Sequence, residues 1–340
     1  MWILYVAVII FLILLGISNL FLNFIFGKRC EGNPKLKYFT VEDFENLEAE
    51  KIEFKSNKEQ ILRGNIYTNK KIKKQEIKGL IVFVHGMGAG HLSYTTEINT
   101  LAKNGYKVLA YDNTGTCESE GKSLNGFYQA ILDLKACLEF IKTDDELNEL
   151  KLSLIGHSWG AYTVCQSLKF SPNVKSVISM CGPDSAEKLI AGYMGVLGKI
   201  LNPFMKLINI IKFGKDSTES TIDILKKSPK SVSILLIHGK DDKTCKLENS
   251  IVYKSEETFK DNKNITCIIY EEKCHNVYQT KESEEYLNTV FDEIAKINKK
   301  FKGKELELKL SSIYENIDYK KITEEDEDVM NEIIDFLNKN

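Results

Sequence analysis

The hydrophobic and polar positions divide this chain of 340 residues into three parts. Residues 2–26 are mostly apolar and contain no charged side chain, and residues 27–48 are largely polar. Residues 49–340 alternate short apolar runs with longer mixed segments. This pattern predicts a hydrophobic helix, a linker and one large folded domain, because a chain of this length can bury a sizeable core.

Short apolar runs predict the strands of a central sheet. Two of them alternate apolar and polar residues, which predicts an antiparallel hairpin with one face in water; they are residues 51–54 and 60–67. Six later runs are almost continuously apolar, as in strands covered on both faces: residues 80–84, 108–111, 152–155, 177–180, 234–237 and 265–270. Helix-length segments lie between them, so the pattern predicts a mostly parallel sheet with helices on both faces.

Two stretches interrupt this alternation. Residues from about 184 to 230 are rich in apolar residues and glycine, which fits either a small helical lid over acyl chains or helices buried against the sheet. Residues from about 283 to 340 form a C-terminal extension longer than one helix. Near its end Val329, Ile333 and Leu337 share one helical face, with Thr323 as the expected N-cap. We expect this last helix to close the fold, which makes residues 283–320 an insertion.

The N-terminal apolar segment is long enough to cross a membrane. At about 1.5 Å per residue, residues 2–26 span roughly 37 Å as a helix, more than the hydrocarbon core of a bilayer. A cleaved signal peptide is the competing interpretation, but it favours a basic start, a shorter apolar core and a small-residue cleavage site. A helix buried in the domain is disfavoured because no face is polar. The composition therefore favours a single transmembrane anchor.

Charge beside this segment predicts its orientation. Basic residues follow it closely and none precedes it: Lys28, Arg29, Lys35 and Lys37. The positive-inside rule places the folded domain in the cytoplasm, and an extracytoplasmic domain behind a signal-anchor is the alternative. Eight cysteines without a C-x-x-C pair agree with free thiols in a reducing compartment. The net charge of −2 offers no attraction to nucleic acid.

A strand-to-helix junction carries the first chemical signal. Residues 156–160 read Gly-His-Ser-Trp-Gly, which fits G-x-S-x-G directly after an apolar run. A serine at such a junction holds a strained backbone, and glycine on each side relieves the crowding there. The helix that follows directs its N-terminal N–H groups at a developing oxyanion. The motif predicts Ser158 as a nucleophile; a serine that only caps a helix is the alternative.

A glycine-rich loop, residues 85–90, follows the apolar run 80–84. Glycine lets the backbone approach a reacting carbonyl, so we expect the N–H groups of Met87 and Trp159 to form an oxyanion hole. A phosphate-binding loop is disfavoured, because G-x-G-x-x-G is not matched and the lysine of such loops is missing.

A base and an orienting acid complete this chemistry. Of the five histidines, His275 lies in a loop beyond the last predicted strand, and the others precede glycines or a helix: His85, His91, His157 and His238. Asp242, after the run 234–237, is the acid candidate, with Asp241 and the more distant Asp184 as rivals.

Together these motifs resemble an α/β-hydrolase. The glycine-rich loop, residues 111–119, Gly-His-Ser-Trp-Gly, His-Gly-Lys-Asp-Asp and Cys-His-Asn follow one another in that family's order. Over residues 50–290 the chain is similar to the lysophospholipase, monoacylglycerol lipase and serine aminopeptidase-like group. Members often have arginine and glycine where this chain has Asn113 and Thr116, so this loop is expected to differ in shape. The resemblance implies an α/β-hydrolase domain over residues 49–340 with a lid at 184–230.

We therefore expect a membrane-anchored serine hydrolase that cleaves carboxylic esters through Ser158, His275 and Asp242. The anchor and the apolar insertion favour a lipid-like ester, and acyl transfer of this kind uses no metal or cofactor. The alternatives are a serine peptidase or amidase, acyl transfer to an acceptor other than water, and a non-catalytic binding protein on the same scaffold. No protein partner is indicated by the sequence.

Overall fold

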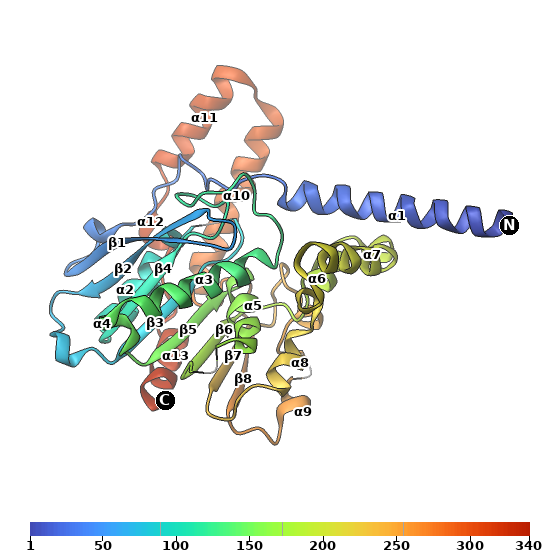
Figure 1. Ribbon diagram of the computed structural model, residues 1–340. Helices are drawn as coiled ribbons and strands as arrows, with labels where there is room; N and C mark the ends of the chain where they lie inside the picture. The colour runs from blue at the N-terminus through green and yellow to red at the C-terminus, as the bar shows by residue number, and fades with distance from the viewer. Residues whose placement is uncertain (89, 172, 254) are drawn as a thin grey trace.

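The computed structural model describes residues 1–88, 90–171, 173–253 and 255–340. Ala89, which belongs to the predicted glycine-rich loop, lies outside these described residues. Eight strands form one sheet in the order β1-β2-β4-β3-β5-β6-β7-β8 (Figure 1). The predicted mostly parallel α/β sheet is confirmed.

The strands coincide with the predicted apolar runs to within a few residues. β1 and β2 pair as an antiparallel hairpin, β2 is antiparallel to β4, and the remaining neighbours are parallel. Their bounds are β1 Leu47–Lys55, β2 Ile61–Asn69, β3 Gly79–Val84, β4 Tyr106–Tyr111, β5 Leu152–His157, β6 Ser176–Met180, β7 Ser233–Gly239 and β8 Ile265–Tyr270.

Helices cover both faces of the sheet, and the side chains of each buried strand alternate between two cores. In β3, Leu80 and Val82 belong to the core beneath α3, α4, α5 and α8, whereas Ile81 and Phe83 belong to the core beneath α2 and α13. These helices are α2 Thr95–Lys103, α3 Gln129–Thr143, α4 Asp145–Asn148, α5 Trp159–Gln166, α8 Thr221–Lys226 and α13 Glu327–Lys339, and α9 Ser255–Phe259 adds Phe259 to the first of the two cores.

The closing helix α13 packs on the sheet as the sequence pattern predicts. Val329, Ile333 and Leu337 are all buried in the core that α13 shares with α2. The expected N-cap was wrong, because Asp326 accepts the N–H of Val329 at 3.0 Å. Thr323 instead ends the preceding short helix and donates its hydroxyl to the carbonyl of Tyr319, the first residue of that helix. A segment containing a β-bridge separates the two helices, so the last one begins later than its sequence suggested.

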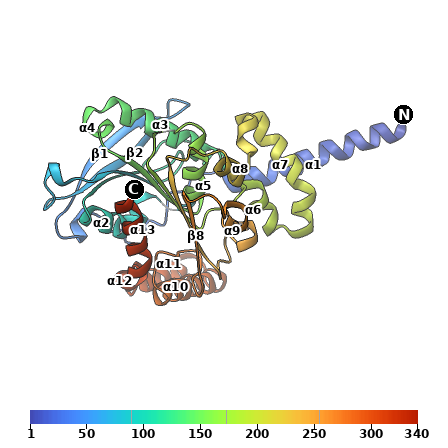
Figure 2. The ribbon, with the colours of Figure 1, turned by 90° about the horizontal axis from the view of Figure 1, so that it is seen from below.

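Three groups of helices lie outside these layers (Figures 1 and 2). Helices α6 and α7 occupy most of the segment expected to be a lid, and α10, α11 and α12 form a projection with its own small apolar core. The N-terminal helix α1 extends away from the domain. Their bounds are α1 Trp2–Phe26, α6 Ala186–Tyr193, α7 Gly195–Phe213, α10 Lys281–Lys300, α11 Gly303–Glu315 and α12 Tyr319–Ile322.

The segment after α1 is fixed to the domain beside the loop that follows β4. The Arg29 guanidinium donates to the carbonyls of Cys117, Ser119 and Gly121 at 2.8, 2.9 and 2.7 Å. The backbone of Cys30 also bonds to this loop: its N–H donates to the carbonyl of Gly115 at 2.8 Å, and its carbonyl accepts the N–H of Cys117 at 3.0 Å. The segment expected to be a linker is therefore held against the sheet domain from its first residues.

Candidate active site

Ser158 lies at the sharp turn between β5 and α5. Its backbone has φ 55° and ψ −113°, a conformation that L-residues rarely adopt. Two glycines make room for the turn: a Cβ on Gly156 would lie 2.2 Å from the carbonyl oxygen of Gly160, and one on Gly160 would lie 1.9 Å from that of Val84. The expectation of a strained serine flanked by glycines that relieve crowding is confirmed.

Three loops at the carboxyl ends of the strands bring Ser158, His275 and Asp242 together. His275 Nε2 lies 2.9 Å from Ser158 Oγ, and His275 Nδ1 lies 2.7 Å from Asp242 Oδ2. Asp242 follows β7 and His275 follows β8, so the parallel sheet places both beside the end of β5. We refer to these three side chains as the Ser158 array.

Asp242 is held in place by more than its histidine. Its Oδ1 accepts the N–H groups of Thr244 and Cys245, each at 2.8 Å. Burial by itself raises the pKa of Asp242, but the hydrogen bond and charge of His275, with the N–H of Cys245, outweigh it, so the net pKa is lowered. The carboxylate stays ionised with one oxygen free to accept His275 Nδ1–H.

The two rival acids face elsewhere. Asp241 is exposed on the surface. Asp184 accepts the Ser220 hydroxyl at 2.6 Å and the Ile222 N–H at 3.1 Å, which fixes the start of α8. Neither carboxylate contacts His275 among the hydrogen bonds of the described residues.

The two expected oxyanion donors, Met87 and Trp159, come from the loop after β3 and from the start of α5. Trp159 begins α5, directly after the serine, and Met87 lies in the loop after β3 that lines the cavity beside Ser158. Within the described part of the chain, neither backbone N–H donates to another backbone carbonyl outside regular helix and strand pairing. Both groups remain available to an oxygen that develops negative charge.

His157 connects the glycine-rich loop to the His275 loop through hydrogen bonds, a role that the sequence did not indicate. Gly86 N–H donates to the Tyr94 hydroxyl at 3.0 Å, and Tyr94 lies 2.9 Å from His157 Nδ1. His157 Nε2 lies 2.9 Å from the carbonyl of His275. Burial and, to a smaller extent, the charge of nearby His275 lower the pKa of His157 to about 3, so the ring is neutral. Because a carbonyl only accepts, Nε2 carries the proton and Nδ1 accepts from Tyr94.

Replacing this ring tests whether it positions the site. His157→Phe removes both hydrogen bonds and is expected to lower kcat about 10- to 100-fold with a smaller change in KM, since His275 and the Gly86 loop lose a shared support. His157→Gln keeps one donor and one acceptor and should recover part of the loss. Steady-state kinetics with a short ester measures both; equal losses in the two variants would contradict the positioning role.

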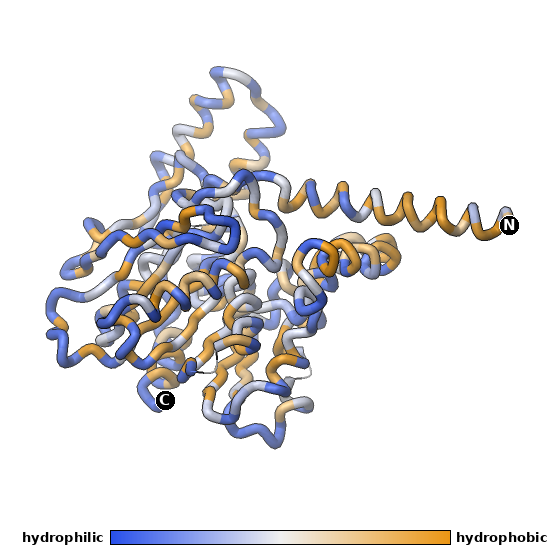
Figure 3. Tube along the Cα trace, viewed as in Figure 1, coloured by the Kyte–Doolittle hydropathy of each residue, from blue (hydrophilic) through white to orange (hydrophobic). Residues whose placement is uncertain are grey.

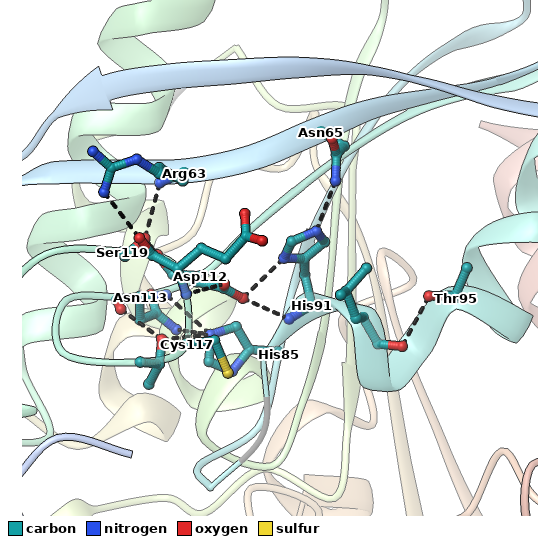
Figure 4. Close-up of polar contacts among 12 residues, drawn as sticks. Arg63, Asn65, His85, His91, Thr95, Asp112, Asn113, Cys117 and Ser119 are labelled. Carbon is teal, nitrogen blue, oxygen red and sulfur yellow. Dashed lines mark hydrogen bonds and ion pairs between the residues drawn. The ribbon is translucent and has the colours of Figure 1, made fainter. Parts of the chain in front are cut away.

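A second buried pair supports the glycine-rich loop (Figure 4). His91 Nδ1 and His91 N–H both lie 2.8 Å from Asp112 Oδ1, while Asn65 Nδ2 lies 2.9 Å from His91 Nε2. Burial by itself raises the pKa of Asp112, but the bonds and charge of His91 outweigh it and the net pKa is lowered. His85 Nε2 likewise accepts the Asn113 N–H at 3.0 Å. These bonds tie the loop after β3 to the loop after β4.

Buried neutral histidines predict a loss of stability in mild acid. Burial lowers the pKa of His85, His157 and His238, whereas an unfolded histidine has a pKa near 6.5. As the pH falls below about 6.5, these histidines bind protons in the unfolded chain but stay neutral in the folded chain. The free energy of unfolding therefore decreases. For His157 this loss continues down to about pH 3. Glu97, whose pKa is raised by burial and by Glu325, contributes with the opposite sign.

Comparing the pH dependence of unfolding in wild type and His157→Gln isolates the contribution of the His157 ring. Urea unfolding of wild type and His157→Gln between pH 7.5 and 5 should show a shallower decrease in the variant. The difference in slope should approach about 1.4 kcal/mol per pH unit, the value for one proton. Identical slopes would contradict a neutral His157 in the folded protein.

A cavity of about 540 Å³ opens beside Ser158. Its lining contains residues of the site described above: Gly86, Met87, Gly88, His157, Ser158 and His275. Further walls come from the segment after α1 and from α10 and α12. No residue of the segment 184–230, all of which the structure describes, lines this cavity. A separate cavity of about 610 Å³ next to Asp242 is lined largely by charged residues and does not include Ser158.

Among the residues that the structure describes, two sets of side chains lie close enough together to share a metal ion. They are His157, Cys181 and His275, and Cys181, His238 and Asp242. Both sets depend on Cys181, and burial raises the pKa of this thiol well above its usual value. His275 and Asp242 of these sets already hydrogen-bond to each other within the Ser158 array.

A mostly parallel sheet, with a serine on a strained turn after its central strand β5, defines the α/β-hydrolase fold. A family model described as serine aminopeptidase, S33, matches residues 75–221, which include Ser158. The chain therefore has the α/β-hydrolase fold, and over residues 75–221 it is similar to a serine-hydrolase family with that fold.

Similar proteins include one curated relative and several solved structures. The abhydrolase domain-containing protein lid-1 of Caenorhabditis elegans is 28% identical over 158 residues, which cover 42% of this chain and 43% of that protein. The Pyrococcus furiosus esterase Pf2001 has a TM-score of 0.57 at 21% identity and covers 77% of this chain and 97% of its own. The Pyrococcus horikoshii acylaminoacyl peptidase has a TM-score of 0.53 at 20% identity, covering 69% and 38%.

Proposed function

We propose that the chain is a membrane-anchored serine hydrolase that cleaves neutral carboxylic esters, including lipid-like ones. The observation that carries the proposal is the Ser158 array, which faces a cavity of about 540 Å³. In this mechanism His275, oriented by Asp242, takes the Ser158 proton as the serine attacks the ester carbonyl. The N–H groups of Met87 and Trp159 stabilise the oxyanion, the alcohol leaves, and water then cleaves the acyl-enzyme.

The charges around the cavity favour an ester over the N-terminus of a peptide. An aminopeptidase has to bind a protonated α-amine, and a cation that leaves water needs a compensating partner. The described residues that line the cavity include no aspartate and no glutamate. Lys37 is the one lysine among them, and its ammonium already pairs with Asp43. A neutral substrate fits this lining without an unpaired charge.

A substrate panel on the full chain separates ester from peptide hydrolysis. We expect turnover of p-nitrophenyl butyrate, and little or none of aminoacyl p-nitroanilides with a free amine. N-acylated aminoacyl p-nitroanilides, which lack that charge, test for an acylaminoacyl peptidase like the P. horikoshii protein in the comparison. Faster hydrolysis of either anilide than of the ester would overturn the ester proposal in favour of a peptidase.

Packing at the inner end of α1 supports a retained anchor rather than a cleaved signal. Ser18, Leu22 and Phe26 are buried, and Leu22 and Phe26 belong to an apolar core that also contains Trp159. Cleavage after residue 26 would remove part of this core beside the nucleophile. Lys28 and Arg29 at the same end favour a cytoplasmic domain.

The geometry of α1 also requires α7 to contact lipid if α1 spans a bilayer. The ring of Phe11 lies 5.4 Å from that of Phe204 in α7, so only residues 2–10, about 14 Å of helix, extend beyond α7. The hydrocarbon core is about 30 Å thick. α7 itself is apolar along most of its length (Figure 3), and Val196, Ile200 and Ile211 are half or more exposed.

Quenching by brominated lipid tests this arrangement. In the full chain carrying Trp2→Phe, the fluorescence of buried Trp159 is a constant background. Ile200→Trp then adds a fluorescent reporter on α7. In nanodiscs, brominated acyl chains should strongly quench Ile200→Trp and leave the matched exposed control Leu308→Trp on α11 unchanged. Equal quenching at both positions, or a purified chain that begins after residue 26, would contradict the anchoring proposal.

A further inference from the structure

The cavity beside Ser158 is lined in part by two segments that lie outside the sheet and its covering helices. One is the segment after α1, which contributes Leu36 and Phe39. The other is the projection of α10 and α12, which contributes Leu287, Phe291, Tyr319 and Ile322. These segments are almost the whole chain apart in sequence, yet they line one cavity with the nucleophile.

Direct contacts hold the two segments together. Asn33 Nδ2 donates to the hydroxyl of Tyr314 in α11 at 2.8 Å. Leu36 packs against the small core of the projection, which includes Tyr314 and Val290. Gln279, in the loop that carries His275, donates to the carbonyl of Ile322 at 3.2 Å. The wall is therefore connected both to the end of the anchor and to the His275 loop.

The wall has the chemistry of a site for an apolar chain. Leu287 and Phe291 are one helical turn apart on α10, so both reach the same cavity. Phe291 leaves 47% of its surface exposed, although it is a large apolar side chain. Partial exposure of such residues around a concave site is typical of surfaces that bind an apolar ligand.

We propose that the segment after α1 and helices α10 and α12 form the wall that binds the apolar chain of the substrate ester and selects its length. This inference rests on the proposed ester hydrolysis at Ser158. It assigns chain binding to residues 30–39 and to the cavity-lining residues of α10 and α12 rather than to the segment 184–230. It also places the binding wall directly after the anchor. The apolar chain of a substrate that leaves a membrane would therefore meet this wall close to the bilayer surface.

Chain-length selectivity tests the wall. The readout is kcat/KM of the full chain for p-nitrophenyl decanoate relative to p-nitrophenyl acetate. Phe291→Ala removes part of the wall and should lower this ratio about tenfold, while the value for acetate changes little. Leu287→Trp narrows the cavity and should also lower the ratio. Leu308→Ala, an exposed leucine of the same projection outside the cavity, is the matched control and should leave it unchanged.

A second series identifies which half of the ester the wall binds. Decyl acetate and ethyl acetate vary the alcohol chain instead of the acyl chain, and a shift in either series supports the wall. Unchanged ratios in both series for Phe291→Ala and Leu287→Trp would overturn the inference. Failure of the proposed function looks different, because acetate hydrolysis would then persist in Ser158→Ala.

Discussion

Ser158→Ala is expected to lose ester hydrolysis by roughly a million-fold in kcat, because the acyl-enzyme can no longer form. The fold should survive, since alanine adopts the strained backbone of this turn no less readily than serine does. Initial rates with p-nitrophenyl butyrate, with the melting temperature beside them, measure both quantities. Ser153→Ala, in strand β5 just before the turn, is the matched control.

The residual rate of Ser158→Ala shows whether Ser158 acts as the nucleophile or whether hydrolysis proceeds without it. Loss of activity with an unchanged melting temperature is the result that supports nucleophilic catalysis by Ser158. A variant that retains more than about one hundredth of the wild-type rate would contradict it, since binding and an oxyanion hole do not replace a nucleophile.

Asp242→Asn is expected to lower kcat roughly ten-thousand-fold. The carboxylate accepts His275 Nδ1–H at 2.7 Å and leaves Nε2 free to accept the serine proton. Its other oxygen accepts two backbone N–H groups, so the amide oxygen of asparagine would occupy that position and its NH2 would face His275. The ring would then hold the wrong tautomer.

Asp241→Asn is the matched control, because its side chain is exposed one position earlier in the same loop. Steady-state kinetics should show near wild-type kcat in this variant. An equal loss in both variants would mean that the charge of the loop, rather than the hydrogen bond to His275, supports the reaction.

Local patterns predicted the sheet and the residues that the structure brings together around Ser158. Continuous apolar runs identify strands covered on both faces, and the parallel order then brings their carboxyl ends to one edge. Ser158 and His275 each stand in the loop directly after such a run, so a sequence reading finds them without knowledge of their contacts. The strained turn at Ser158 follows from its two glycines in the same way.

Contacts between distant segments could not be read from the sequence. The sequence places His157 directly before a predicted helix, and its spacing says nothing about Tyr94 or the carbonyl of His275. The buried pair of His91 and Asp112 depends on the parallel pairing of β3 with β4, which brings the loops after these two strands side by side. Asp112 directly after an apolar run was the one available signal.

The cavity walls illustrate the same limit. Sequence alone suggested a lid at 184–230, because that segment is apolar and rich in glycine. The lining instead comes from Leu36 and from Phe291, which approach each other only after the projection of α10, α11 and α12 packs on the segment after α1.

Fluorophosphonate labelling tests the central claim most directly, since the probe reacts covalently with an activated serine and needs no knowledge of the substrate. The full chain should be labelled at a single peptide, with the adduct on Ser158, and labelling should disappear in Ser158→Ala and fall sharply in His275→Ala. A wild-type chain that stays unlabelled, or an adduct on another serine, would contradict a serine hydrolase built on the Ser158 array.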